Sequence, residues 1–166
     1  MTTPTGPRPR TREHGFSIPE LLAVMALMAL LILFGGPAMA DGFRSYKVRS
    51  AADILSTDVR ALRYSAVATR ASLTMTLNNQ SHATAPNQYT YTNSKGVTIV
   101  RPIENGVNLE TGSAASITFG TTGSTGLTSS QTLIVSMGIN ATRGDRYTIS
   151  ISPSGTVSTA YTTYVP

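Results

Sequence analysis

The fold of this chain is decided by the stretch LLAVMALMALLILFGGPAMA at residues 21–40, which contains no charged side chain. An α-helix rises about 1.5 Å per residue, so this stretch is long enough to cross the roughly 30 Å hydrocarbon core of a bilayer. Near its end, Gly35, Gly36 and Pro37 are poor helix formers, and they predict a kink or local melting. We therefore expect a transmembrane helix over residues 16–40.

A second helical pattern follows at residues 41–72. Apolar residues recur there at spacings of three and four, which places them on one face of a helix, and charged residues fall largely elsewhere. The apolar face consists of Ala52, Leu55, Val59, Leu62 and Ala66. The pattern predicts an amphipathic helix that covers an apolar surface and that continues the membrane segment into one helix of about 50 residues.

Beyond Ser72 the apolar period changes from helical to alternating, which is typical of strands. Alternation occurs at residues 73–77, 89–91, 97–99, 117–119 and 147–151, and residues 132–137 indicate a more buried strand. Turn residues separate these segments at 78–79, 94–96, 105–106, 120–130, 143–145 and 152–155. Residues 73–166 are therefore expected to form an antiparallel β-sheet domain packed on the long helix, an α+β fold.

The length of 166 residues allows one such domain beside a membrane segment. The net charge of +5 is concentrated before the β domain: residues 41–72 hold six basic and three acidic side chains, whereas residues 73–166 hold four and three. A basic stripe beside a membrane segment is more typical of a solvated or headgroup-facing surface than of a nucleic-acid site.

The composition gives little basis for catalysis. The chain has no cysteine, which excludes disulfides, thiolate zinc sites and cysteine nucleophiles. After residue 15 the only histidine is His82, and no histidine lies near a serine-centred turn. We expect no enzyme activity, no catalytic residue, no metal site and no cofactor.

The N-terminus carries the most specific motif. Residues 1–15 are rich in Thr, Pro and Arg and lack apolar periodicity, as a targeting or processing segment does. They lead into Gly15-Phe16-Ser17-Ile18-Pro19-Glu20 and then the apolar run. This arrangement resembles the class III leader of type IV prepilins and pseudopilins. The resemblance implies that prepilin peptidase cleaves between Gly15 and Phe16, that residues 1–15 are the leader peptide, and that the new Phe16 amine is N-methylated.

Glu20 is the unusual residue at the start of this helix. A carboxylate in a membrane helix costs about 2.5 to 3.5 kcal/mol on insertion scales, so it suggests a partner. The resemblance implies that this partner is the Phe16 amine of an adjacent subunit, which gives Glu20 a role in subunit assembly. It also implies contacts with other pilins or pseudopilins, with an inner-membrane assembly platform and with membrane lipid.

Two alternatives remain for this region. Ala38-Met39-Ala40 before Asp41 has the small-residue pattern of a signal-peptidase site, and cleavage there would release a soluble periplasmic domain. The length of the apolar run, and the presence of Pro19 and Glu20 at its beginning, favour the prepilin interpretation. Glu20 could also belong to the interfacial region of an ordinary anchor.

The β region resembles the GspH/FimT group of minor pseudopilins at residues 117–120, 133–136 and 144–157. In that group a long N-terminal helix is followed by β-sheets. The FimT branch linked to DNA uptake carries a Gly-Arg-x-Arg cluster, whereas Gly144 is followed here by Asp145. Arg143 and Arg146 remain as candidates for weak contact with DNA, with Asp145 cancelling part of their field.

These observations predict a minor type IV pilin or a type II secretion pseudopilin, a structural subunit that helps to initiate or cap a pilus or pseudopilus. The alternative is a membrane-anchored or released binding module for DNA, exoprotein or a surface. Arg8, Arg10 and Arg12 favour a cytoplasmic leader. We thus expect a single-pass protein of the bacterial inner membrane with residues 41–166 in the periplasm, incorporated after assembly into the filament.

Overall fold

The computed structural model describes residues 16–78, 87–104, 106–110 and 112–166. It contains a long helix α1 (Ile18–Thr69) and antiparallel strands, and it therefore has the expected α+β fold. The chain divides into two compact units after Met39. The local melting expected at residues 35–37 is not observed, since these residues are helical.

Helix α1 ends in a tight hydrogen-bonded cap. The Ala71 N–H donates to the Ala66 carbonyl at 3.2 Å, and the Arg70 N–H donates to the Val67 carbonyl at 3.3 Å. This pair of bonds is the Schellman arrangement, which requires a left-handed residue just past the helix. Arg70 occupies that position with φ of 50°, although glycine is the residue that adopts it without steric cost.

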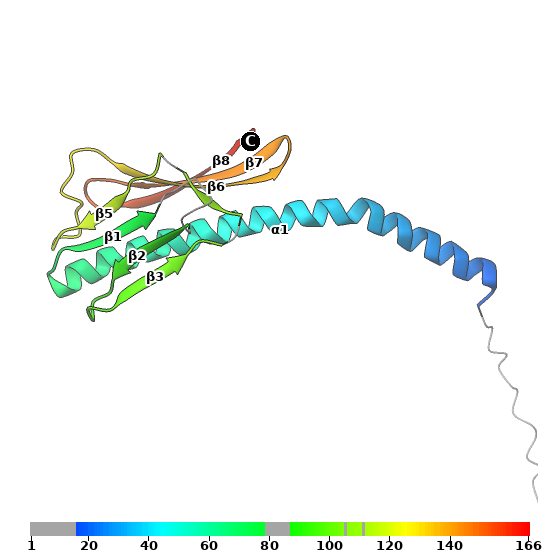
Figure 1. The fold of residues 1–166 in the computed structure, drawn as a ribbon, viewed down its shortest axis with the longest axis horizontal. Coiled ribbons are helices and arrows are strands. Elements are labelled where there is room, and N and C mark those ends of the chain that lie inside the picture. Colours follow the sequence, from blue (N-terminus) through cyan, green and yellow to red (C-terminus); the bar gives the residue numbers. More distant parts are fainter. Residues whose placement is uncertain (1–15, 79–86, 105, 111) are drawn as a thin grey trace, which may run out of the picture. The chain divides into compact units, whose positions relative to one another are not determined.

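The strands of residues 40–166 form two antiparallel sheets, which lie on the same part of α1 (Figure 1). The first has the order β3-β2-β1-β5 and the second has the order β4-β6-β7-β8. The bounds of the first sheet are β1 (Leu73–Asn78), β2 (Gln88–Thr92), β3 (Thr98–Pro102) and β5 (Ser116–Phe119). Those of the second are β4 (Asn108–Leu109), β6 (Gln131–Asn140), β7 (Arg143–Ile151) and β8 (Val157–Tyr164).

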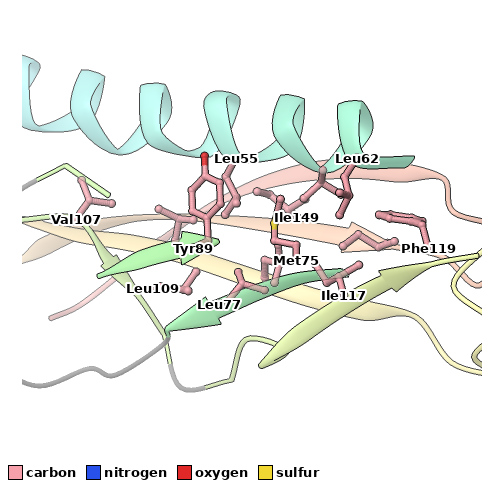
Figure 2. Packing of buried hydrophobic residues seen from close by; sticks show 14 of the residues in the cluster. Leu55, Leu62, Met75, Leu77, Tyr89, Val107, Leu109, Ile117, Phe119 and Ile149 are labelled. Atoms are coloured by element: carbon pink, nitrogen blue, oxygen red, sulfur yellow. The ribbon is translucent and has the colours of Figure 1, made fainter. Parts of the chain in front are cut away.

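The predicted apolar face of the helix is confirmed as the centre of the core. Its members are each at most 1% exposed; they are Ala52, Leu55, Val59, Leu62 and Ala66. Figure 2 shows Leu55 and Leu62 pointing from α1 toward Met75, Ile117 and Ile149, which come from both sheets. Burying one large aliphatic side chain contributes about 1.5 to 3 kcal/mol, so this stripe holds helix and sheets in one cooperative unit.

A buried polar contact also joins α1 to the first sheet. The Tyr89 hydroxyl points to the helix (Figure 2) and donates to Asp58 Oδ2 at 2.7 Å. Arg101 Nε lies 3.6 Å from the same oxygen. Burial, and then the bond to Asp58, raise the pKa of Tyr89 above its usual value, so the phenol stays protonated and keeps donating. Asp58, although buried, therefore has both a donor and a cation beside it.

The turn predicted at residues 143–145 is wrong. These residues begin β7, and the hairpin turn precedes them, with the Thr142 N–H donating to Asn140 Oδ1 at 3.0 Å. Gly144 faces the ring of Tyr164 so closely that an added Cβ would collide with it. The glycine thus serves close strand packing and does not mark a turn.

Other turn and strand predictions have different outcomes. The turn at 152–155 is confirmed, with Gly155 at φ of 83° and its N–H donating to the Ser152 carbonyl at 2.8 Å. Strands β4 and β8 were not predicted. His82 lies outside the described residues.

Candidate membrane-anchoring and assembly site

The first turn of α1 is capped by Ser17. The Glu20 N–H donates to the Ser17 carbonyl at 3.1 Å and makes a longer contact of 3.4 Å with Ser17 Oγ. Ser17 is therefore the N-cap, and Glu20, three residues later, occupies the position that acidic residues favour in a capping box. The Ser-x-x-Glu spacing of residues 17–20 is a sequence signal for this N-cap, although the capping role of Ser17 was not predicted.

Glu20 thus has a local structural role besides the predicted assembly role. It is the acidic residue of the first turn, where the positive end of the helix dipole stabilises a carboxylate by about 0.3 to 1 kcal/mol. Its side chain is exposed, and the side chain of Phe16, just before the helix, is 80% exposed. Phe16 and Glu20 lie at the same helix end. Gly15, the other residue of the predicted cleavage site, and the arginines at positions 8, 10 and 12 lie outside the described residues.

The apolar half of α1 is uncovered within the described chain. Every side chain from residue 18 to residue 34 is exposed, although most are large aliphatic or aromatic groups. By length and composition this part of the helix, near the N-terminus, can cross a membrane. An exposed apolar surface of this extent requires lipid or protein to cover it. The chain therefore contains a candidate single-pass membrane anchor.

In the β domain, Arg143 is engaged by a buried carboxylate. Its Nη2 lies 3.0 Å from Asp145 Oδ1, and the hydroxyl of Tyr161 donates to the same oxygen at 3.0 Å. The side chain of Asp145 is only 3% exposed. Burial raises the pKa of Asp145, but hydrogen bonds from Ser45, Tyr161 and Arg143 outweigh it, so that the pKa lies below its usual value. Because Ser45 belongs to α1, this carboxylate also ties the helix to β7.

Arg146 is engaged as well. Its Nε donates to Glu110 Oε1 at 2.9 Å, and its guanidinium carbon lies 4.7 Å from the centre of the Tyr164 ring. Both arginines named as DNA candidates thus have carboxylate partners within the chain, which reduces the positive field available to phosphates. Contact of Arg143 and Arg146 with DNA stays a prediction, and these pairings do not favour it.

The described residues bring together no group of three His, Asp or Glu side chains able to hold a metal ion. All five tyrosines of the described strands have contacts within the chain, and Tyr91 stacks on Tyr89 with ring centres 6.4 Å apart. Tyr89 bonds Asp58, Tyr147 packs against Tyr161 with ring centres 5.1 Å apart, and Tyr164 lies beside Arg146. These contacts account for the tyrosines as sheet residues.

No family model, curated protein or solved structure matches the chain.

Proposed function

We propose that this chain is a membrane-anchored structural subunit of the type IV pilin class, either a minor pilin or a type II secretion pseudopilin that helps to initiate or cap a filament. The observation that carries the proposal is the uncovered apolar half of α1, which begins with a single carboxylate, Glu20, in its first turn. An apolar helix of this kind is covered either by lipid or by similar helices of neighbouring subunits.

In this proposal the subunit first resides in the bacterial inner membrane, with residues 16–40 in the bilayer and the β domain in the periplasm. Prepilin peptidase removes residues 1–15, and the Phe16 amine becomes the N-methylated terminus. Lipid is then exchanged for neighbouring pilins or pseudopilins at the assembly platform. Among the packed apolar helices of the filament, where water is excluded, the Phe16 amine of one subunit and the Glu20 carboxylate of its neighbour neutralise each other.

The first part of the test is the mature N-terminus. Intact mass and N-terminal sequencing of the membrane-bound protein should give a start at Phe16, and Gly15→Ala should retain residues 1–15. A start at Asp41 would instead show signal-peptidase cleavage and would remove the anchor on which the proposal depends.

The second part separates charge pairing from helix capping at Glu20. Glu20→Gln keeps a side chain that a capping box accepts but removes the charge, whereas Ser17→Ala removes the cap and keeps the charge. We expect Glu20→Gln and Glu20→Ala to be cleaved and membrane-resident but to crosslink poorly to other pilins. Ser17→Ala should crosslink like the parent protein, because the N-cap stabilises the helix by only about 0.5 to 2 kcal/mol.

Processing, fractionation and crosslinking should be measured in the same cells. If Glu20→Gln crosslinks as well as the parent protein does, the charge-pair mechanism is wrong for this subunit. If, in addition, Ser17→Ala crosslinks poorly, Glu20 acts chiefly through the N-cap of α1.

A further inference from the structure

Helix α1 carries exposed aromatic side chains directly after the candidate anchor, residues 16–40. Phe43 is 62% exposed and Tyr46 is 69% exposed. At about 1.5 Å per residue, they follow residue 40 by about 4.5 Å and about 9 Å along the helix. The polar layer on each side of the hydrocarbon core is about 5 to 7 Å thick. With the anchor in a bilayer, Phe43 therefore lies within that layer and Tyr46 at its outer edge. These distances concern residues 40–46 alone, so they hold for any angle between the two units of the chain.

The β6–β7 turn is fastened to the same part of α1. Asn140 Nδ2 donates to Asp41 Oδ2 at 3.1 Å, and Arg44 Nη1 donates to the Ile139 carbonyl. Residues 140–143 are all exposed and include no acidic side chain. The turn therefore lies beside the first helical turns that follow the anchor.

The aromatic residues and the β6–β7 turn lie on different sides of α1. Phe43 follows Asp41 by two residues, and Tyr46 follows Arg44 by two. Successive residues of an α-helix are rotated by about 100°, so each aromatic side chain points about 160° away from the residue that holds the turn. Together with Lys47 these groups surround the helix. We call this surface, residues 43, 46, 47 and 140–143, the collar.

The cations of the collar are Lys47 and Arg143. Each has a carboxylate partner, Glu104 at 3.2 Å and Asp145 at 3.0 Å, but the two side chains remain 41% and 50% exposed. Pairing reduces their long-range field, whereas a phosphate in direct contact needs only exposed N–H donors. Aromatic rings combined with Lys or Arg are typical of the boundary between hydrocarbon and water. The collar thus has the chemistry of a surface that binds phospholipid headgroups.

We propose that the collar docks onto the phospholipid headgroups of the bilayer that holds the anchor, so that the β domain rests on the membrane before the subunit is assembled. The chain itself brings this partner to the collar, because the collar begins three residues after the end of the anchor. The inference rests on the anchor of the proposed function but not on the pilin class. Entry into a filament then requires the collar to leave the headgroups.

The absence of cysteine allows a test with single fluorophores attached to introduced cysteines. The full-length protein is placed in vesicles of phosphatidylethanolamine and phosphatidylglycerol, in which part of the lipid carries a nitroxide quencher on its headgroup. The collar probe is Ala141→Cys, in the β6–β7 turn. We expect strong quenching there, because the turn lies among the headgroups.

Two further probes serve as controls. Ser158→Cys lies at an exposed position of β8 opposite Ser150, which is about 24 Å along β7 from Arg143, and should be quenched weakly. Leu30→Cys lies in the anchor and should be quenched by lipids brominated on their acyl chains. This last probe tests the anchor separately from the collar.

A matched pair of variants tests the aromatic side chains. Tyr46 and Tyr64 are both 69% exposed and are 18 residues apart, which is five helical turns, so they lie on the same face of α1. Phe43→Ser combined with Tyr46→Ser should lower the quenching at position 141 to the level at position 158. Tyr64→Ser, about 36 Å beyond residue 40, should leave it unchanged.

The outcomes separate the two proposals. If position 30 is quenched but position 141 is quenched no more than position 158, the collar does not dock and only this inference is overturned. If position 30 is not quenched, the anchor itself is wrong and the proposed function is overturned with it. Unchanged quenching at position 141 in the double serine variant would overturn the role of the aromatic side chains. Protection of position 141 from both the nitroxide lipid and aqueous iodide would show that protein, not lipid, covers the collar.

Discussion

Residues 18–39 and 40–69 belong to one helix, yet they bury their apolar side chains very differently. In the first part, the side chains of residues 18–34 are all exposed. In the second part, Leu55, Val59 and Leu62 are fully buried beneath the sheets, while Ile54 and Tyr64 remain exposed. The comparison shows that the distribution of apolar residues around a helix decides its surroundings: a helix that is apolar all round suits lipid, and a helix with a single apolar stripe suits a protein core.

The largest expected effect comes from replacing a buried leucine of the second part by alanine, with the same replacement in the exposed first part as the control. Leu62→Ala should lower the free energy of unfolding of the β domain by about 2 to 5 kcal/mol, because it leaves a cavity in the core. Leu30→Ala removes the same atoms from an exposed position and should leave that free energy unchanged. The chain lacks tryptophan, so urea unfolding in detergent can be followed by tyrosine fluorescence. Equal losses in the two variants would contradict the distinction.

A smaller effect is expected at Asp145, where the second part of α1 is tied to β7 through Ser45. Asp145→Asn should destabilise the domain by about 1 to 3 kcal/mol at pH 7, because it weakens a buried hydrogen-bond network. The folded-state pKa of Asp145 lies below its unfolded value, so the stabilisation is present above the unfolded pKa of about 3.9 and is lost as the pH falls through the folded pKa.

The difference in stability between the parent protein and Asp145→Asn should therefore shrink as the pH is lowered from about 5. Thermal unfolding at a series of pH values measures this difference. A constant difference across the acid range would mean that the charge of Asp145 does not contribute. Asp53→Asn, at an exposed position of α1, provides the matched control.

The smallest effect is a gain at the end of the buried part. Arg70→Gly should stabilise the domain by about 0.5 to 1 kcal/mol, because glycine adopts the left-handed conformation of this cap without steric cost. Arg60→Gly, inside the helix, should instead destabilise it by about 1 kcal/mol. Urea midpoints of the two variants should move in opposite directions. A loss of stability in Arg70→Gly would indicate that the arginine side chain contributes more than the strained backbone costs.

The sequence by itself was sufficient to predict the long helix, its membrane-length apolar part and the stripe around Leu55 and Leu62. Helical periodicity and apolar length are local properties, so they can be read without knowledge of the partners. The same holds for the strands whose apolar residues alternate, such as 73–77 and 147–151. At the candidate site, the motif around Phe16 and Glu20 is also local, and its interpretation as an assembly site came from resemblance.

Only the tertiary structure decided which strands are edges, and which charges are neutralised. β8 has no apolar alternation. It forms a strand because all eight of its residues pair with β7. Asp145 already lies between Arg143 and Arg146 in the sequence, but only sheet pairing brings Tyr161 to Arg143, and only the fold brings Glu110 to Arg146. The physical reason is that pairing between distant segments depends on the chain being brought together by its core, and local patterns do not contain that information.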